Sequence, residues 1–65
     1  MRIDRIKLNA ALLRADMKQK EIAEKTGLSR NTVTSVFGGK SCSEATAIKI
    51  ANALGVTLSE IREGR

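Results

Sequence analysis

Apolar residues recur at steps of three and four along most of the chain, which is the spacing of one face of an α-helix. Between about Asp4 and Ala15 this face comprises Leu8, Ala11, Leu12 and Ala15, with Ile6 and Leu13 beside it. A later segment repeats the spacing with Ala47, Ile50, Ala51 and Leu54. The sequence has no proline and no strand-like alternation of apolar and polar residues. The pattern therefore predicts an all-α fold class.

Two shorter helical patterns follow one another between residues 18 and 37. Ile22 and Ala23 mark the buried side of the first, and the buried side of the second comprises Val33, Val36 and Phe37. Between them, Gly27 suits a left-handed residue just past a helix end, and Ser29 suits the N-cap of the next helix. Two short helices joined by a tight, glycine-containing turn form a helix-turn-helix.

Capping residues predict where the other helices begin and end. Asp4 suits the N-cap of the first helix, and Thr57 with Glu60 has the spacing of a capping box before a short last helix. The fourth helix has two competing N-caps, Ser41 (which forms a capping box with Glu44) and Ser43, after a loop at residues 38–42, and Gly55 ends it. The last helix is expected to end near Arg62, with Glu63-Gly64-Arg65 fraying. We expect a single domain over residues 1–65, with five short helices around one core.

The second helix begins poorly. Lys18 stands at its N-cap, where a lysine side chain accepts no hydrogen bond from the open amides, although Glu21 can bond back to the Lys18 amide. Amides left open at a helix start suit an external phosphate. The alternative is that the chain simply tolerates a weak cap.

Composition narrows the class of partner. Twelve Lys and Arg against seven Asp and Glu give a net charge of +5, which serves solubility alone or, combined with a helix-turn-helix, favours a polyanion. The single cysteine, Cys42, and the absence of histidine argue against a disulfide, a metal site or a cofactor. No signal peptide or apolar run of membrane length occurs, so a cytoplasmic location is expected. Without a histidine-based triad, a clustered set of carboxylates or a base for Cys42, the chain is not expected to be an enzyme.

Polar residues occupy the outer face of the third helix. If Val33, Val36 and Phe37 point inward, the opposite face presents Arg30, Asn31, Thr34 and Ser35. Arginine suits the two major-groove acceptors of guanine, and asparagine suits the donor and acceptor of adenine. The alternative is an ordinary solvated helix face.

Residues along nearly the whole chain resemble the Cro and lambda-repressor-like (XRE-type) helix-turn-helix family. The residues that carry the resemblance are Gln19, Ile22-Ala23, Gly27, Ser29, Val33, Gly39-Lys40, Ala51, Leu54-Gly55-Val56 and Leu58. The resemblance implies a lambda-repressor-like domain of bacterial or phage origin, acting at the nucleoid on double-stranded DNA. It also implies that the third helix reads bases through Arg30, Asn31, Thr34 and Ser35.

The resemblance further implies a set of DNA phosphate contacts. These fall at Lys18, Gln19, Ser29, Gly38, Gly39, Lys40 and Ser43, with the amides of Gly38 and Gly39 forming part of the clamp. Arg14 and Lys20 either add positive charge nearby or are ordinary solvated surface residues, and the second interpretation is preferred for each residue alone. The sequence departs from the family pattern where an Arg and a Glu commonly form a buried ion pair, because Leu12 and Phe37 stand there and are expected to pack together. Gly38 also replaces a frequent Asn.

The expected function is sequence-specific transcriptional regulation, most simply by a repressor that binds a pseudo-palindromic operator as a homodimer. Val56, Leu58 and Ile61 form a candidate dimer surface, or else they close the core. An alternative is an antitoxin-like module whose main partner is a toxin protein. No small-molecule ligand or membrane partner is expected.

Overall fold

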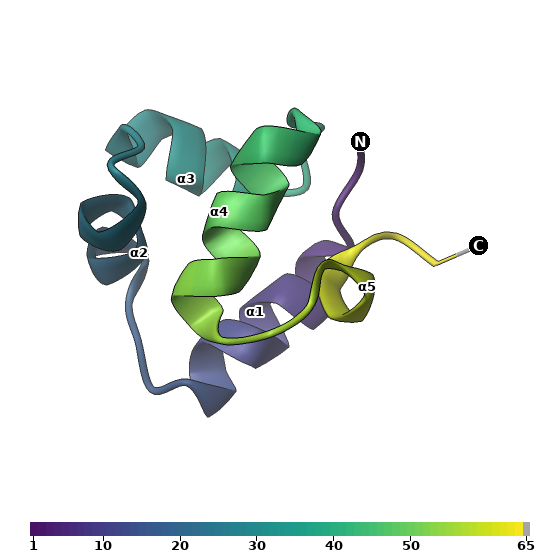
Figure 1. Cartoon of the computed structure of the whole chain (residues 1–65), viewed down its shortest axis with the longest axis horizontal. Helices are drawn as coiled ribbons and strands as arrows, with labels where there is room; N and C mark the ends of the chain where they lie inside the picture. Colours follow the sequence, from purple (N-terminus) through teal and green to yellow (C-terminus); the bar gives the residue numbers. More distant parts are fainter. Residues whose placement is uncertain (65) are drawn as a thin grey trace.

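The computed structural model describes residues 1–64, which form five helices (Figure 1). The helices are α1 (Arg5–Arg14), α2 (Gln19–Thr26), α3 (Arg30–Phe37), α4 (Glu44–Leu54) and α5 (Leu58–Ile61). Besides these helices, Ile3 and Arg62 form one antiparallel bridge. The predicted all-α architecture is confirmed.

The core is apolar, and the predicted helix faces supply most of it. Leu8, Ala11, Ile22 and Val33 are buried together with Val36, Phe37 and the face of α4. Leu12 and Ala15 are partly buried and pack against this cluster, whereas Ile6 and Leu13 are exposed. Leu12 therefore packs against the same core that holds Phe37.

The predicted caps hold at most helix ends. Asp4 Oδ1 accepts hydrogen bonds from the amides of Ile6 and Lys7 (2.9 and 3.2 Å), and Thr57 N donates to Glu60 Oε2 (2.7 Å). Gly27 and Gly55 both adopt φ of +75°, which ends α2 and α4. Of the two competing caps for α4, Ser43 is the one that accepts from the Thr46 amide (3.1 Å), so α4 begins two residues after the Ser41 alternative.

The turn between α2 and α3 gives the helix-turn-helix its angle. Thr26 Oγ1 donates to Ile22 O (2.7 Å) and accepts from the Leu28 amide (3.2 Å), which fixes the turn around Gly27. In Figure 1, α2 points nearly along the line of sight while α3 runs across the view, and α4 packs against α2. The outer side of α3 is left uncovered.

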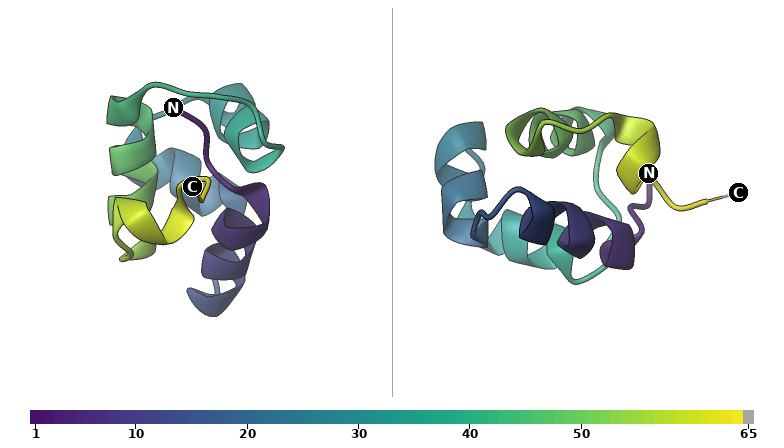
Figure 2. Two further views of the ribbon diagram at one scale, coloured as in Figure 1. Left: turned by 90° about the vertical axis from the view of Figure 1, so that its right-hand side faces the viewer. Right: turned by 90° about the horizontal axis from the view of Figure 1, so that it is seen from below.

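The N-terminal segment and the end of α5 hold each other in place. Asp4 N donates to Ile61 O (2.9 Å), and Glu63 N donates to Arg2 O (3.1 Å). The expected fraying is therefore wrong at Glu63, because its amide is paired; Arg65 lies outside the described residues. The two views of Figure 2 show the two ends of the described chain on the same side of the molecule.

Candidate nucleic-acid interface

The outer face of α3 carries the predicted base-reading side chains. Arg30, Asn31 and Thr34 are exposed, while Ser35 is half-buried. Their direction follows from the opposite side of the helix, where Val33, Val36 and Phe37 are buried at 1–3 % exposure. The structure thus brings these four residues onto one face, with Ser35 least accessible.

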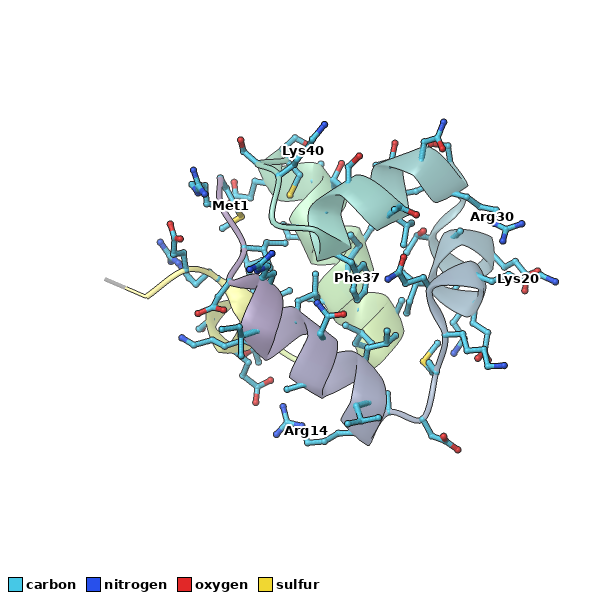
Figure 3. All side chains as sticks on the ribbon, turned by 180° about the vertical axis from the view of Figure 1, so that it is seen from behind. Met1, Arg14, Lys20, Arg30, Phe37 and Lys40 are labelled. Carbon is cyan, nitrogen blue, oxygen red and sulfur yellow. The ribbon has the colours of Figure 1, made fainter. Side chains whose placement is uncertain are left out.

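Arg30 lies where the first turn of α3 meets the first turn of α2. A shallow groove of about 80 Å³ there is lined by Gln19, Lys20, Arg30, Val33 and Thr34. Figure 3 shows Arg30 and Lys20 extending from the same end of the molecule. Lys20, for which the sequence left both added charge and simple solvation open, therefore lies beside Arg30 on this candidate interface. Its position directly after Gln19 was the only signal available in the sequence.

The start of α2 has open amides, as the weak cap predicted. Lys18 adopts the extended N-cap conformation, and its amide donates to Glu21 Oε1 (3.0 Å). Within residues 1–64 the amides of Gln19 and Lys20 donate to no protein acceptor, whereas those of Glu21 and Ile22 both donate to Lys18 O. Two open amides next to two exposed lysines form a surface suited to an anion.

The loop after α3 does not provide the expected amide clamp. The Gly38 amide donates to Thr34 O and Ser35 O (3.0 and 3.1 Å), the Gly39 amide to Val36 O (3.0 Å) and the Lys40 amide to Ser35 O (3.1 Å). These bonds satisfy the free carbonyls at the end of α3. The prediction that the Gly38 and Gly39 amides face a phosphate is therefore wrong, and the exposed Lys40 side chain is the basic group that the loop itself supplies.

The two serines assigned to phosphate contact are both caps. Ser29 Oγ accepts from the Thr32 amide (3.1 Å) and donates to Thr32 Oγ1 (2.9 Å). Ser43 makes the same pair of bonds with Thr46 (3.1 and 3.0 Å). Since phosphate oxygens only accept, either serine hydroxyl would donate to DNA only if its hydrogen bond with the threonine reversed, with the threonine hydroxyl as the donor.

The electrostatics of this surface are set by unpaired basic groups. Among residues 1–64 the one ion pair joins Arg2 Nε to Glu63 Oε1 (3.5 Å), in a cleft that Gly38 and Gly39 also line. Lys18, Lys20, Arg30 and Lys40 thus carry their charge unpaired in the described chain. The face formed by α3, the start of α2 and the loop after α3 has the charge that a polyanion requires.

The candidate dimer residues differ in accessibility. Ile61 is fully buried, while Val56 and Leu58 are partly buried and pack against the core. Ile61 is therefore a core residue in this structure, which leaves Val56 and Leu58 as the accessible part of the candidate surface.

Cys42 is half-buried beside the chain start, where its carbonyl accepts from the Met1 amino group (2.9 Å). Burial raises the pKa of the Cys42 thiol above its ordinary value, against a smaller opposite effect of the amino group. The residue is therefore a thiol at neutral pH. Nowhere in residues 1–64 do three His, Cys, Asp or Glu side chains gather as metal ligands would, and none of the described helices is long and apolar enough to cross a membrane.

Comparison with known proteins gives one match. The family model described as "Helix-turn-helix" matches residues 8–61, from the first buried turn of α1 to the end of α5. No curated protein and no solved structure matches the chain.

Proposed function

Because the chain belongs to the Cro and lambda-repressor-like (XRE-type) helix-turn-helix family, and is thus a DNA-binding transcriptional regulator, we propose that it is a repressor that binds a pseudo-palindromic operator as a homodimer. The observation that carries this proposal is the exposed polar face of α3, which begins with Arg30 and Asn31 beside the open start of α2. Repression would follow from occupying the operator.

In this proposal α3 lies in the major groove with its first turn against the base edges. Arg30 donates to O6 and N7 of a guanine, and Asn31 bonds to N6 and N7 of an adenine. Thr34, one turn further along the same face, contacts the next base edge or a thymine methyl group. Ser35 contributes least, since it is half-buried.

Phosphate contacts come from both sides of α3. At its start, the lysines Lys18 and Lys20 and the open amides of Gln19 and Lys20 meet one DNA strand. At its end, Lys40 meets the other strand. An eight-residue helix is about 12 Å long, close to the width of about 12 Å of the major groove, so basic side chains that flank its two ends are far enough apart to reach the two strands.

Dimerisation is proposed because one module of this size makes few base contacts, and linking two modules multiplies affinity and specificity. Val56 and Leu58 are the residues proposed to meet a second copy. Both residues pack against the core and are only partly buried. Contact of their exposed parts with a second copy would leave the buried Ile61 undisturbed.

The experiment that tests the proposal is selection of bound sequences from a random DNA pool, followed by sedimentation of the complex with the selected duplex. An enriched inverted repeat bound by two chains supports the operator-binding homodimer. Enrichment of a single half-site bound by one chain contradicts the homodimer but not the sequence-specific binding. If no sequence is enriched, the specific regulator is contradicted, and capture of a toxin-like partner becomes the antitoxin test.

Arg30→Ala gives the first prediction on the selected duplex. Loss of a bidentate guanine contact should weaken binding by about 1–3 kcal/mol and relax the preference at one base position in each half-site. Repeating the selection with the variant measures both effects. Lys25→Ala is the matched control, because Lys25 is exposed in the last turn of α2, outside the interface. Equal loss in the two variants would mean that Arg30 contributes charge and not base recognition.

A further inference from the structure

The loop after α3 lacks free amides, yet it lies at the end of α3 where the proposed DNA complex requires a second backbone contact. The amides of Gly38, Gly39 and Lys40 all donate to carbonyls of α3. Side chains must therefore supply the positive charge there. Lys40 is one such side chain, and the structure contains a second that comes from a different helix.

Arg5, the first residue of α1, runs across this loop. A Cβ atom built on Gly39 would lie 3.5 Å from Cδ, 3.9 Å from Cβ and 4.0 Å from Cγ of Arg5, so the arginine stem lies next to the glycine and an added side chain would contact it. Gly39 has a φ of +100°, a conformation that also favours glycine. Figure 2 and Figure 3 show the first turn of α1 beside the turn that follows α3, where Figure 3 labels Lys40.

The turn of α1 that carries Arg5 is fixed to the end of α3. Asn9 Nδ2 donates to Arg5 O (2.7 Å) and to Phe37 O (3.1 Å), which ties the two helices together at this point. The backbone of Arg5 is thus held relative to the loop, and less conformational freedom is lost when its guanidinium binds.

Arg5 is an exposed residue, and its guanidinium takes part in no ion pair within residues 1–64. Arg5 lines an open cleft of about 350 Å³. Its charged neighbours in this cleft are Arg2, Asp4 and Glu63. Arg2 pairs with Glu63, and the Asp4 carboxylate caps α1 by accepting the amides of Ile6 and Lys7. Arg5 is the cation of this cleft that neither an ion pair nor a cap engages.

We propose that Arg5, whose stem lies next to Gly39, and Lys40, the residue that follows Gly39, form the DNA-backbone contact at the end of α3. This inference rests on the proposed binding of DNA by α3. The guanidinium presents a planar fork that suits a phosphate bidentately, whereas Lys40 contributes a point charge. The contact is independent of base sequence and requires α1 to approach the DNA strand that borders the major groove.

The test is a salt titration of binding to a duplex of unselected sequence, about 20 base pairs long and so about two helical turns. Each phosphate contact adds about 0.9 to the slope of log K against log salt concentration. Arg5→Gln should reduce the slope by about one unit and weaken binding to the unselected and the selected duplex by the same factor. Arg5→Lys should keep the slope, because it keeps the charge.

Arg2→Gln is the matched control, since it removes one positive charge from the same cleft but from a group already paired with Glu63. Its slope should stay that of the parent. If Arg5→Gln and Arg2→Gln lower the salt slope equally, the effect of Arg5 is one of net charge only, and the proposed contact is overturned. An unchanged slope in Arg5→Gln would overturn it as well. Thermal unfolding by circular dichroism verifies the fold of each variant, and Arg5→Met, which retains more of the stem, replaces Arg5→Gln if that variant is less stable.

Lys40→Ala and Arg30→Ala separate this inference from the proposed function. If both weaken binding while Arg5→Gln does not, the backbone contact is made without α1 and only the Arg5 inference fails. If the parent chain binds neither duplex, the proposed function fails and the Arg5 contact fails with it.

Discussion

Phe37, the last residue of α3, has its side chain in the core and its carbonyl group bonded to α1. Its side chain is 3 % exposed, and its carbonyl accepts from Asn9 on α1. Leu12, at the other position where the family commonly has a charged partner, packs against the same core. Replacing an ion pair by packed hydrocarbon at both positions leaves no unpaired charge, which is the favourable way to lose such a pair.

Phe37→Glu should therefore unfold the domain. It removes a buried aromatic ring and places an unpaired carboxylate in the core, at a cost of about 3–5 kcal/mol, and a domain this small has only a few kcal/mol of stability. Urea unfolding followed by circular dichroism measures the loss. Phe37→Leu is the control and should keep the fold, since it stays apolar.

The double variant Leu12→Arg with Phe37→Glu then tests whether the two positions touch. A contact predicts that the arginine recovers part of the stability lost in Phe37→Glu, as a coupling energy between neighbours. A Phe37→Glu variant that melts like the parent would instead show that position 37 is not a core position in solution.

Two helices, α2 and the short α5, begin without an amide hydrogen bond to the side chain of the N-cap residue. Asp4, Ser29 and Ser43 each accept an amide hydrogen bond at the starts of α1, α3 and α4, whereas Lys18 accepts none. Lys18→Ser should stabilise the protein by about 1 kcal/mol, because serine is a good N-cap. The same change should weaken DNA binding and reduce the salt slope by about one unit, because it removes a lysine from the start of α2.

Thermal unfolding and a salt titration on one DNA duplex measure these two opposite effects. Lys25→Ser removes the same charge from the last turn of α2 and should leave the salt slope unchanged. It should not stabilise the protein, because a lysine there interacts favourably with the helix dipole and is a better helix former than serine. If Lys18→Ser gains stability and binds DNA as tightly as the parent, the open start of α2 serves no phosphate and is only a tolerated weak cap.

The same elements show what the sequence could predict. Periodic apolar positions and local caps gave the helices and their faces, because both signals depend on residues within one turn of each other. The direction of the Gly38 and Gly39 amides could not be predicted, since it depends on carbonyls freed at the end of α3. The groove shared by Lys20 and Arg30, and the approach of Arg5 to Gly39, arise from helix packing and have no local signal.

At the scale of the whole molecule, the chain ends close the core. Ile3, which no predicted helix contains, is 2 % exposed, and it forms the bridge with Arg62. On the same segment, Cys42 N donates to Met1 O (3.0 Å), so the residues before α1 link α5 to the loop before α4. The position of Arg5 over Gly39 depends on this closure.

Ile3→Ala should therefore destabilise the whole domain by about 2–4 kcal/mol, as expected for truncating a buried isoleucine. Ile6→Ala is the matched control: Ile6 is 75 % exposed on α1, and its loss should change the free energy of unfolding by no more than about 0.5 kcal/mol. Urea unfolding of both variants provides the comparison.

Because the core and the DNA-binding face share α3, one cooperative transition is expected, with DNA binding lost over the same urea range as helicity. If Ile3→Ala and Ile6→Ala are equally stable, Ile3 does not contribute to the core in solution. DNA binding that persists at urea concentrations where the N-terminal segment has already detached would lead to the same conclusion, that the five helices close the core without this segment.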